Sequence, residues 1–311
     1  RLHLGFACHS RVCLGINRFE LARFVLHNGR LKHQHRFAMP ALPPIPKAQS
    51  PQRVLTRRFA TPRTILALML REMSARYGRS PGGYLWALLE PLGAILILSV
   101  AFSIFIRNPP LGSSFLLFYA TGYLPFMLYN SVSGMVARSI NYSRPLLMYP
   151  AVTWVDAMLA RFFLNALTGL TVTFLMLLGI MIFIESRSVL ELPPILLAHA
   201  MALVVGLGVG ALNCALFGLL PAWELIWGIA MRPLFLASGV MFIYEDMPPL
   251  AREILWYNPI LHVTGELRRG IYPMYDASYV NPAYVLFLGL AGLFVGCVLL
   301  GRYHRDILND A

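Results

Sequence analysis

Six long apolar runs constrain the fold of this chain more than any other feature of its sequence. A helix needs about 20 consecutive, mostly apolar residues to cross a bilayer. Six runs qualify, and they cover residues 85–106, 115–137, 162–184, 194–219, 225–243 and 283–301. The fifth contains Arg232 followed by Pro233, which weakens the prediction of a full span and leaves a broken or shortened helix open. The sequence therefore predicts an all-α polytopic membrane protein with six transmembrane helices.

Charged residues are scarce, and their signs are unevenly distributed. They make up 13% of the chain, against about 25% in soluble domains, which indicates an integral membrane protein. The net charge of +12 belongs to the N-terminal part, because residues 1–80 hold 15 Lys and Arg but 2 Asp and Glu. Residues 81–311 hold 11 Lys and Arg and 12 Asp and Glu. In a membrane protein such a basic segment favours anionic lipid headgroups over nucleic acid as its partner.

The first 60 residues differ in character from the rest. They show no sustained periodicity, and five prolines exclude regular structure between residues 40 and 51. We interpret residues 1–60 as a basic, Pro-rich extension that is disordered or dispensable. The sequence begins with Arg, and Met39 opens a stretch that would be an ordinary start. We therefore expect residues 1–38 to be upstream translated sequence or a dispensable tail.

A helix on the membrane surface is predicted over residues 63–79, directly before the first apolar run. Its apolar residues recur at three- and four-residue spacing: Leu66, Met69, Leu70 and Met73. Its charged residues fall elsewhere on the helical wheel: Arg71, Glu72 and Arg76. A helix with one apolar and one charged stripe suits a membrane surface better than its centre. The sequence Ser-Pro-Gly-Gly at residues 80–83 then breaks the helix before the first span.

Basic residues near the ends of the runs set the orientation, because they prefer the cytoplasmic side. With the N-terminus inside, nine arginines are cytoplasmic: Arg63, Arg71, Arg76, Arg79, Arg138, Arg144, Arg161, Arg302 and Arg305. Five lie on the opposite side: Arg107, Arg187, Arg252, Arg268 and Arg269. This bias predicts a cytoplasmic N-terminus, and six spans return the C-terminus to the cytoplasm.

Two connections are too long to be simple links. Residues 138–161 form a polar and aromatic segment on the inner side. Residues 244–281 form a long outer segment with apolar stretches too short to span, such as 254–263. We expect the outer segment to contain short, re-entrant helices that dip back into the outer leaflet.

The sequence gives weak support for catalysis. It contains no Gly-rich phosphate loop ending in Lys-Ser/Thr, no His-Glu-x-x-His and no paired-cysteine motif. We therefore predict that this chain has no catalytic residue, metal site or nucleotide site of its own. A membrane-embedded glycan-processing enzyme would need a polar catalytic cluster in the spans. An ion-coupled secondary transporter would show inverted repeats with broken helices, and no internal repeat is visible.

Candidates for a substrate path come from ionisable and aromatic residues at the spans. Glu90, Asp156 and Arg232 lie in or near apolar runs, where charges are functional candidates, although Glu90 and Asp156 could also simply face headgroups. One face of the second span carries four aromatic residues: Tyr119, Tyr123, Phe126 and Tyr129. They could stack on sugar rings or pack between helices. The Gly-x-x-x-Gly motifs at residues 206–210 and 292–296 indicate close helix approach.

Four stretches in the same order give the chain a family resemblance. The run RSPGGYLWALLEPL at residues 79–92 resembles the entry of type-2 ATP-binding-cassette (ABC) export permeases. The segment from Asn141 through Arg144-Pro145 to Asp156 and Arg161 is similar to their first cytoplasmic loop. MRPLFLASGVMF at 231–242 resembles their penultimate span. Residues 257–280 most closely resemble the capsular polysaccharide permeases of Gram-negative bacteria. The resemblance covers about residues 60–311.

The resemblance implies a homodimer of six-span permeases paired with two ATPase subunits, which would bind ATP and Mg. It implies a multi-pass protein of the bacterial inner membrane that moves a lipid-linked polysaccharide outward to periplasmic and outer-membrane export proteins. The surface helix and the inner segment would contact the ATPase through Arg71, Arg76, Asn141, Tyr142, Arg144, Pro145 and Asp156. O-antigen and teichoic-acid-type polymers remain alternative substrates.

Overall fold

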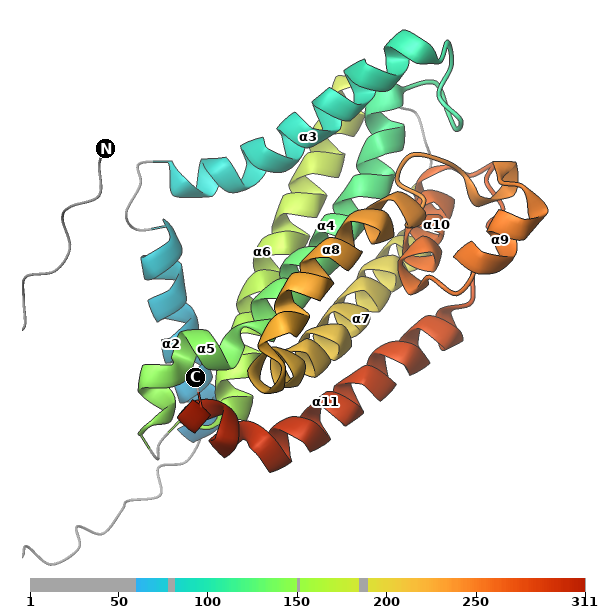
Figure 1. Cartoon of the computed structure of the whole chain (residues 1–311). Coiled ribbons are helices and arrows are strands. Elements are labelled where there is room, and N and C mark those ends of the chain that lie inside the picture. The colour runs from blue at the N-terminus through green and yellow to red at the C-terminus, as the bar shows by residue number, and fades with distance from the viewer. Residues whose placement is uncertain (1–59, 78–81, 150–151, 185–189, 311) are drawn as a thin grey trace, which may run out of the picture. The chain divides into compact units, whose positions relative to one another are not determined.

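The computed structural model describes residues 60–77, 82–149, 152–184 and 190–310, all within the unit Arg57–Ala311. The expectations for residues 1–59 lie outside this part. The regular elements of the described residues are all helical (Figure 1). They are α2 (Ala60–Tyr77), α3 (Gly83–Phe105), α4 (Phe115–Ala137), α5 (Ser139–Leu147), α6 (Trp154–Phe183), α7 (Leu192–Leu219), α8 (Pro221–Ala237), η1 (Tyr244–Asp246), α9 (Pro249–Leu255), α10 (Pro259–Ile271) and α11 (Pro282–Asp310).

Each of the six apolar runs contains a helix, and three of these helices have an end that differs from the end of the run. α6 begins at Trp154 rather than at residue 162, and α11 continues to Asp310 rather than ending at 301. Hydropathy identifies only the apolar part of a helix, whereas the backbone hydrogen bonds of the helix continue through polar residues. α8 ends at Ala237 rather than at 243, because the chain turns at Gly239 with φ of +71°. Such a positive φ is readily adopted by glycine alone.

Four of the described helices are long and apolar enough to cross a membrane: α3, α6, α7 and α11. The chain is therefore a polytopic membrane protein. α4 is 23 residues long, but its sequence includes several tyrosines and polar residues and most of it is buried. α8 has 17 residues and buries none of them. These two helices thus differ in their surroundings, with α4 in the interior and α8 on the surface.

The core forms where α4 packs against α6 on one side and α7 on the other, and α7 packs against α11. Figure 1 shows α4, α6 and α7 side by side, with α3 at a wide angle to them. Glycines allow these close approaches. A Cβ atom on Gly206 or Gly210 would lie 3.1 Å or 2.7 Å from side chains of α4, and one on Gly296 would lie 2.6 Å from the α7 backbone. Both predicted Gly-x-x-x-Gly contacts are confirmed.

Residues 244–281 contain two short α-helices, α9 and α10. α10 packs into the bundle against α4 and α7, and most of its residues are buried. Its Arg268 is 2% exposed and donates hydrogen bonds to the carbonyls of Phe242, at 2.9 Å, and Val240, at 3.4 Å. The guanidinium also lies 4.3 Å from the centre of the Phe118 ring. Arg268 therefore holds the turn after α8 against α4.

Candidate functional site

Three adjoining pockets form a groove between α3, α4, α6 and α8. The first, of about 230 Å³, lies between α3, α4 and α6, and it shares Glu90 and Ser131 with a second of about 320 Å³. A third, of about 410 Å³ between α4 and α8, shares Phe126 and Asn130 with the second. We call these three pockets the groove. Its aromatic and charged lining includes Trp86, Glu90, Tyr123, Phe126, Asn130 and Arg232.

The groove carries charges that the described chain does not neutralise. Glu90 and Arg232 are both exposed, and neither forms an ion pair with another described residue. By contrast, Arg138 at the edge of the second pocket pairs with Glu224 of α8 at 2.9 Å. A charge within a span normally faces water or a partner. The groove is therefore suited to contact water, a polar ligand or another subunit.

The four aromatic residues predicted to line a path divide into two pairs. Tyr119 and Tyr129 are 0% and 2% exposed. The Tyr119 ring lies 5.3 Å from that of Phe102 and 5.2 Å from that of Phe118, so it is a packing residue in this structure. Tyr123 is half-buried and Phe126 is 6% exposed; both border the groove, and both rings meet Phe235 of α8 edge-on.

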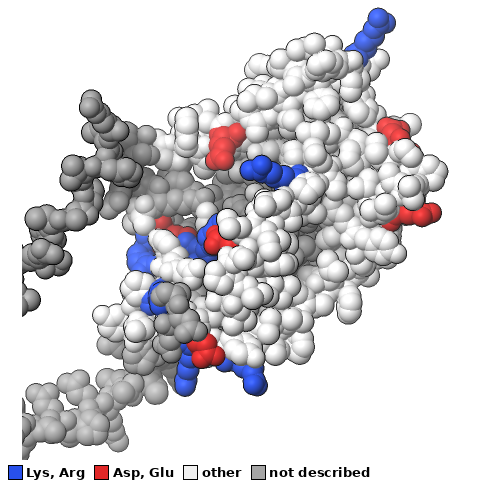
Figure 2. Space-filling model, in the orientation of Figure 1, with Lys and Arg blue, Asp and Glu red and all other residues white. Residues whose placement is uncertain are grey.

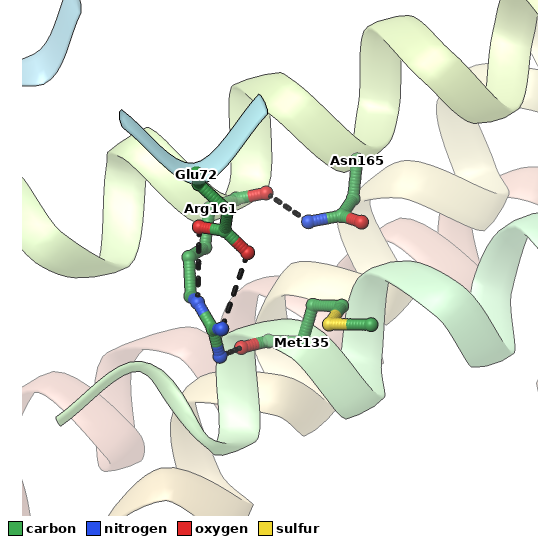
Figure 3. Close-up of polar contacts among 4 residues, drawn as sticks. All are labelled: Glu72, Met135, Arg161 and Asn165. Atoms are coloured by element: carbon green, nitrogen blue, oxygen red, sulfur yellow. Dashed lines mark hydrogen bonds and ion pairs between the residues drawn. The ribbon is translucent and has the colours of Figure 1, made fainter. Parts of the chain in front are cut away.

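A buried ion pair joins α2 to α6 (Figure 3). Arg161 of α6 donates from Nε to Glu72 Oε2 at 3.2 Å, and its Nη2 lies 3.1 Å from Glu72 Oε1. Both side chains are 7% exposed. The Nη1 of Arg161 donates to the carbonyl of Met135 in α4 at 3.0 Å. Asn165 donates to the Arg161 carbonyl at 2.8 Å. Three helices therefore meet at one guanidinium.

Tyr142 of α5 brings a fourth helix to this cluster. The Arg161 guanidinium lies 4.0 Å from the centre of its ring, and that of Arg71 lies 5.3 Å from it. Arg144, on the same helix, donates instead to the carbonyl of Leu308 in α11 at 2.6 Å. Asn141 and Pro145 are exposed on α5. The side chain of Arg76 lies outside the described part.

Two sequence-based assignments need correction. Asp156 does not lie on a protruding surface, because it is 4% exposed and forms a capping box with Thr153 at the start of α6. Glu72 does not lie on an outer charged stripe of α2, because it is buried against Arg161, while Leu66 and Leu70 are about half exposed. Sequence reasoning missed the importance of Arg161 and Glu72. The only signal was a charge at the border of an apolar run, which does not reveal its partner.

Comparison with known proteins places the chain in a family. The family model for ABC-2 type transporters matches residues 63–272. The chain belongs to the ABC-2 type transporter family. It is a transmembrane subunit of that family, consistent with its four apolar helices.

Three named relatives align along most of their lengths. The polysialic acid transport protein KpsM of Escherichia coli is 28% identical over 79% of this chain and 96% of its own. The capsule polysaccharide export inner-membrane protein CtrC of Neisseria meningitidis is 26% identical, over 79% and 92%. The corresponding protein BexB of Haemophilus influenzae is 25% identical, over 79% and 92%.

Proposed function

We propose that this chain is the permease subunit of an ATP-driven exporter that moves a lipid-linked capsular polysaccharide across a bacterial inner membrane. Two copies would pair with two ATPase subunits, which bind ATP and Mg and supply the energy. The polymer would pass to periplasmic and outer-membrane export proteins. The names of the three relatives support this substrate class.

The observation that carries the proposal is the lining of the groove. The rings of Tyr123 and Trp86 can pack on the apolar faces of sugars, and each such contact contributes about 1 kcal/mol. Contacts of that size hold a polymer without stopping it. Arg232, unpaired among the described residues and exposed at the α8 side of the groove, provides a cation for an anionic glycan or its phosphate linker. Glu90 can accept hydrogen bonds from sugar hydroxyls.

The proposed membrane arrangement adds α4 and α8 to the four apolar helices, giving six crossings with both termini in the cytoplasm. α9 and α10 would lie at the outer leaflet. Figure 2 supports this orientation, because Lys and Arg gather where α2, α5 and the end of α11 lie. Exposed basic residues on these elements include Arg63, Arg71, Arg302 and Arg305. This basic end, with Asn141 and Tyr142 of α5, is the proposed docking surface for the ATPase.

The test separates lining from packing residues. Tyr123→Ala and Arg232→Gln are expected to leave the membrane level of the protein and ATP hydrolysis near normal, while surface polysaccharide falls several-fold. Tyr119→Ala, the matched control within α4, is expected to lower the protein level itself, because such core truncations cost about 3–5 kcal/mol. If Tyr123→Ala acts only by removing protein from the membrane, the groove is not the path.

A strain that lacks the chain tests the identity of the substrate. O-antigen and teichoic-acid-type polymers are the alternatives, and they are distinguished by which surface polymer disappears when the chain is deleted. Loss of capsule alone is expected. Export that persists without the ATPase but requires an ion gradient would support a secondary transporter instead.

A further inference from the structure

We propose that the Glu72–Arg161 ion pair is the joint that transmits movement of α2 to the walls of the groove, and that Arg161 is therefore a positioning residue. The inference rests on the proposed function, because it assumes that a partner ATPase moves the end of the molecule containing α2.

The attachment of α2 to the bundle depends on this pair. α2 packs chiefly on α6, and Leu68 and Glu72 are its buried side chains among those described. Leu66 and Leu70, which the sequence suggested as its apolar face, are 55% and 54% exposed. Apolar contacts, made by Leu68 and by the half-buried Ile65, Met69 and Met73, do not by themselves fix a direction. A two-point contact between guanidinium and carboxylate fixes direction as well as distance, so α2 and α6 are expected to move together.

The pair also reaches both sides of the groove. Arg161 donates to the carbonyl of Met135, which lines the second pocket. Asn165 donates to the carbonyl of Arg161 and lines the first pocket. Tyr142 lies against the other side of the same guanidinium. Displacement of α2 or α5 therefore acts on one residue, whose guanidinium contacts Met135 of the second pocket and whose backbone carbonyl holds Asn165 of the first.

Burial makes the joint stiff. Removing one partner would leave an unpaired charge in a low-dielectric site, which is strongly unfavourable, whereas replacing both with apolar residues of similar volume is often tolerated. The contact is thus either intact or broken. An element with this property transmits a rigid-body displacement instead of absorbing it.

The decisive variant replaces both partners, as Glu72→Leu with Arg161→Met, in the complete complex with its ATPase. We expect normal membrane levels and continued ATP hydrolysis, but about tenfold less polysaccharide exported per ATP hydrolysed. Arg107→Gln, which removes an exposed cation from the segment after α3, is the matched control and should export normally. Unchanged export per ATP in the double variant would show that the pair serves folding alone and would overturn the proposal.

A second measurement tests the role of the ion pair independently of the proposed function. Spin labels at Leu70→Cys and Leu167→Cys, both on exposed positions, report the distance between α2 and α6 in the purified chain. A narrow distance distribution is expected with the pair intact, and a broad one in the double variant. A narrow distribution in both would show that Leu68 packing alone fixes α2, and the joint would be rejected. Absence of ATP-dependent export by the wild-type complex would refute the proposed function instead.

Discussion

Gly208 shows how a single residue sets the spacing of two helices. A Cβ atom at this position would lie 2.0 Å from the carbonyl oxygen of Gly289 in α11. α7 and α11 therefore pack backbone against backbone, with Gly206 and Gly210 serving the opposite contact with α4. Without a hydrophobic driving force between helices in lipid, close van der Waals contact of this kind is a main source of association.

The first prediction is that Gly208→Ala destabilises the protein by about 1–3 kcal/mol, because the added methyl group forces the helices apart. The measurement is thermal unfolding of the purified protein in detergent. Gly93→Ala is the matched control, since a Cβ there meets nothing within 4 Å. It should be neutral or slightly stabilising, as alanine favours the helical state over glycine. Equal effects of the two substitutions would contradict the role assigned to the close approach.

Charged residues show what a sequence can and cannot reveal at this scale. Glu90 and Arg232 are functional candidates in the sequence because they are charged and lie in apolar runs. In the structure, both line the groove. The same criterion marked Asp156, whose carboxylate forms a helix cap in the structure. It could not anticipate the pairing of Glu72 with Arg161, since their contact depends on how α2 packs across α6. Side-chain partners far apart in sequence are set by tertiary packing.

At the scale of elements, the capping box at the start of α6 gives a second prediction. Asp156→Ala is expected to lower stability by about 1 kcal/mol, the usual cost of losing a cap, and to leave export per molecule unchanged. Thermal unfolding and surface polysaccharide, normalised to protein level, measure the two effects. Thr153→Ala removes the hydrogen bond that the Asp156 N–H donates to the Thr153 hydroxyl, and it should have the same effect on stability and export. A defect in export per molecule for Asp156→Ala alone would restore a direct role in coupling.

α5 gives a third prediction. Tyr142 lies between the guanidiniums of Arg71 and Arg161, so Tyr142→Ala removes cation–π contacts of about 0.5–2 kcal/mol each. We expect α5 to loosen from α2 and α6, and export per ATP hydrolysed to fall. Tyr142→Phe is the matched control, because it keeps the ring and removes only the hydroxyl. Normal coupling in Tyr142→Ala would limit the role of the ring to local packing.

At the scale of the whole molecule, the order of helices followed from the sequence but their arrangement did not. Apolar runs located α3, α4, α6, α7, α8 and α11, but a helix can continue past its apolar part, as in α6 and α11, or end at a turn, as α8 does before Gly239. Nothing in the runs indicated that α4 would be enclosed while α8 would bury no residue. In a bilayer both environments are apolar, so hydropathy cannot distinguish a core helix from a lipid-facing one.

The last prediction concerns the number of crossings, and α8 is its critical element. Its 17 residues extend about 25 Å at the helical rise, less than the roughly 30 Å of a typical hydrocarbon core, so six crossings require local thinning or help from the turn after Ala237. Single cysteines on a background without the native four can be labelled with an impermeant thiol reagent in intact spheroplasts. The expected labelled positions are Asn108, Leu190 and Met274, and the expected protected ones are Asn141, Leu220 and Asp306. All six are exposed in the structure. Leu220 decides the matter, because it connects α7 to α8. If it is labelled together with Leu190 and Met274, neither helix crosses the membrane and the six-span arrangement is wrong.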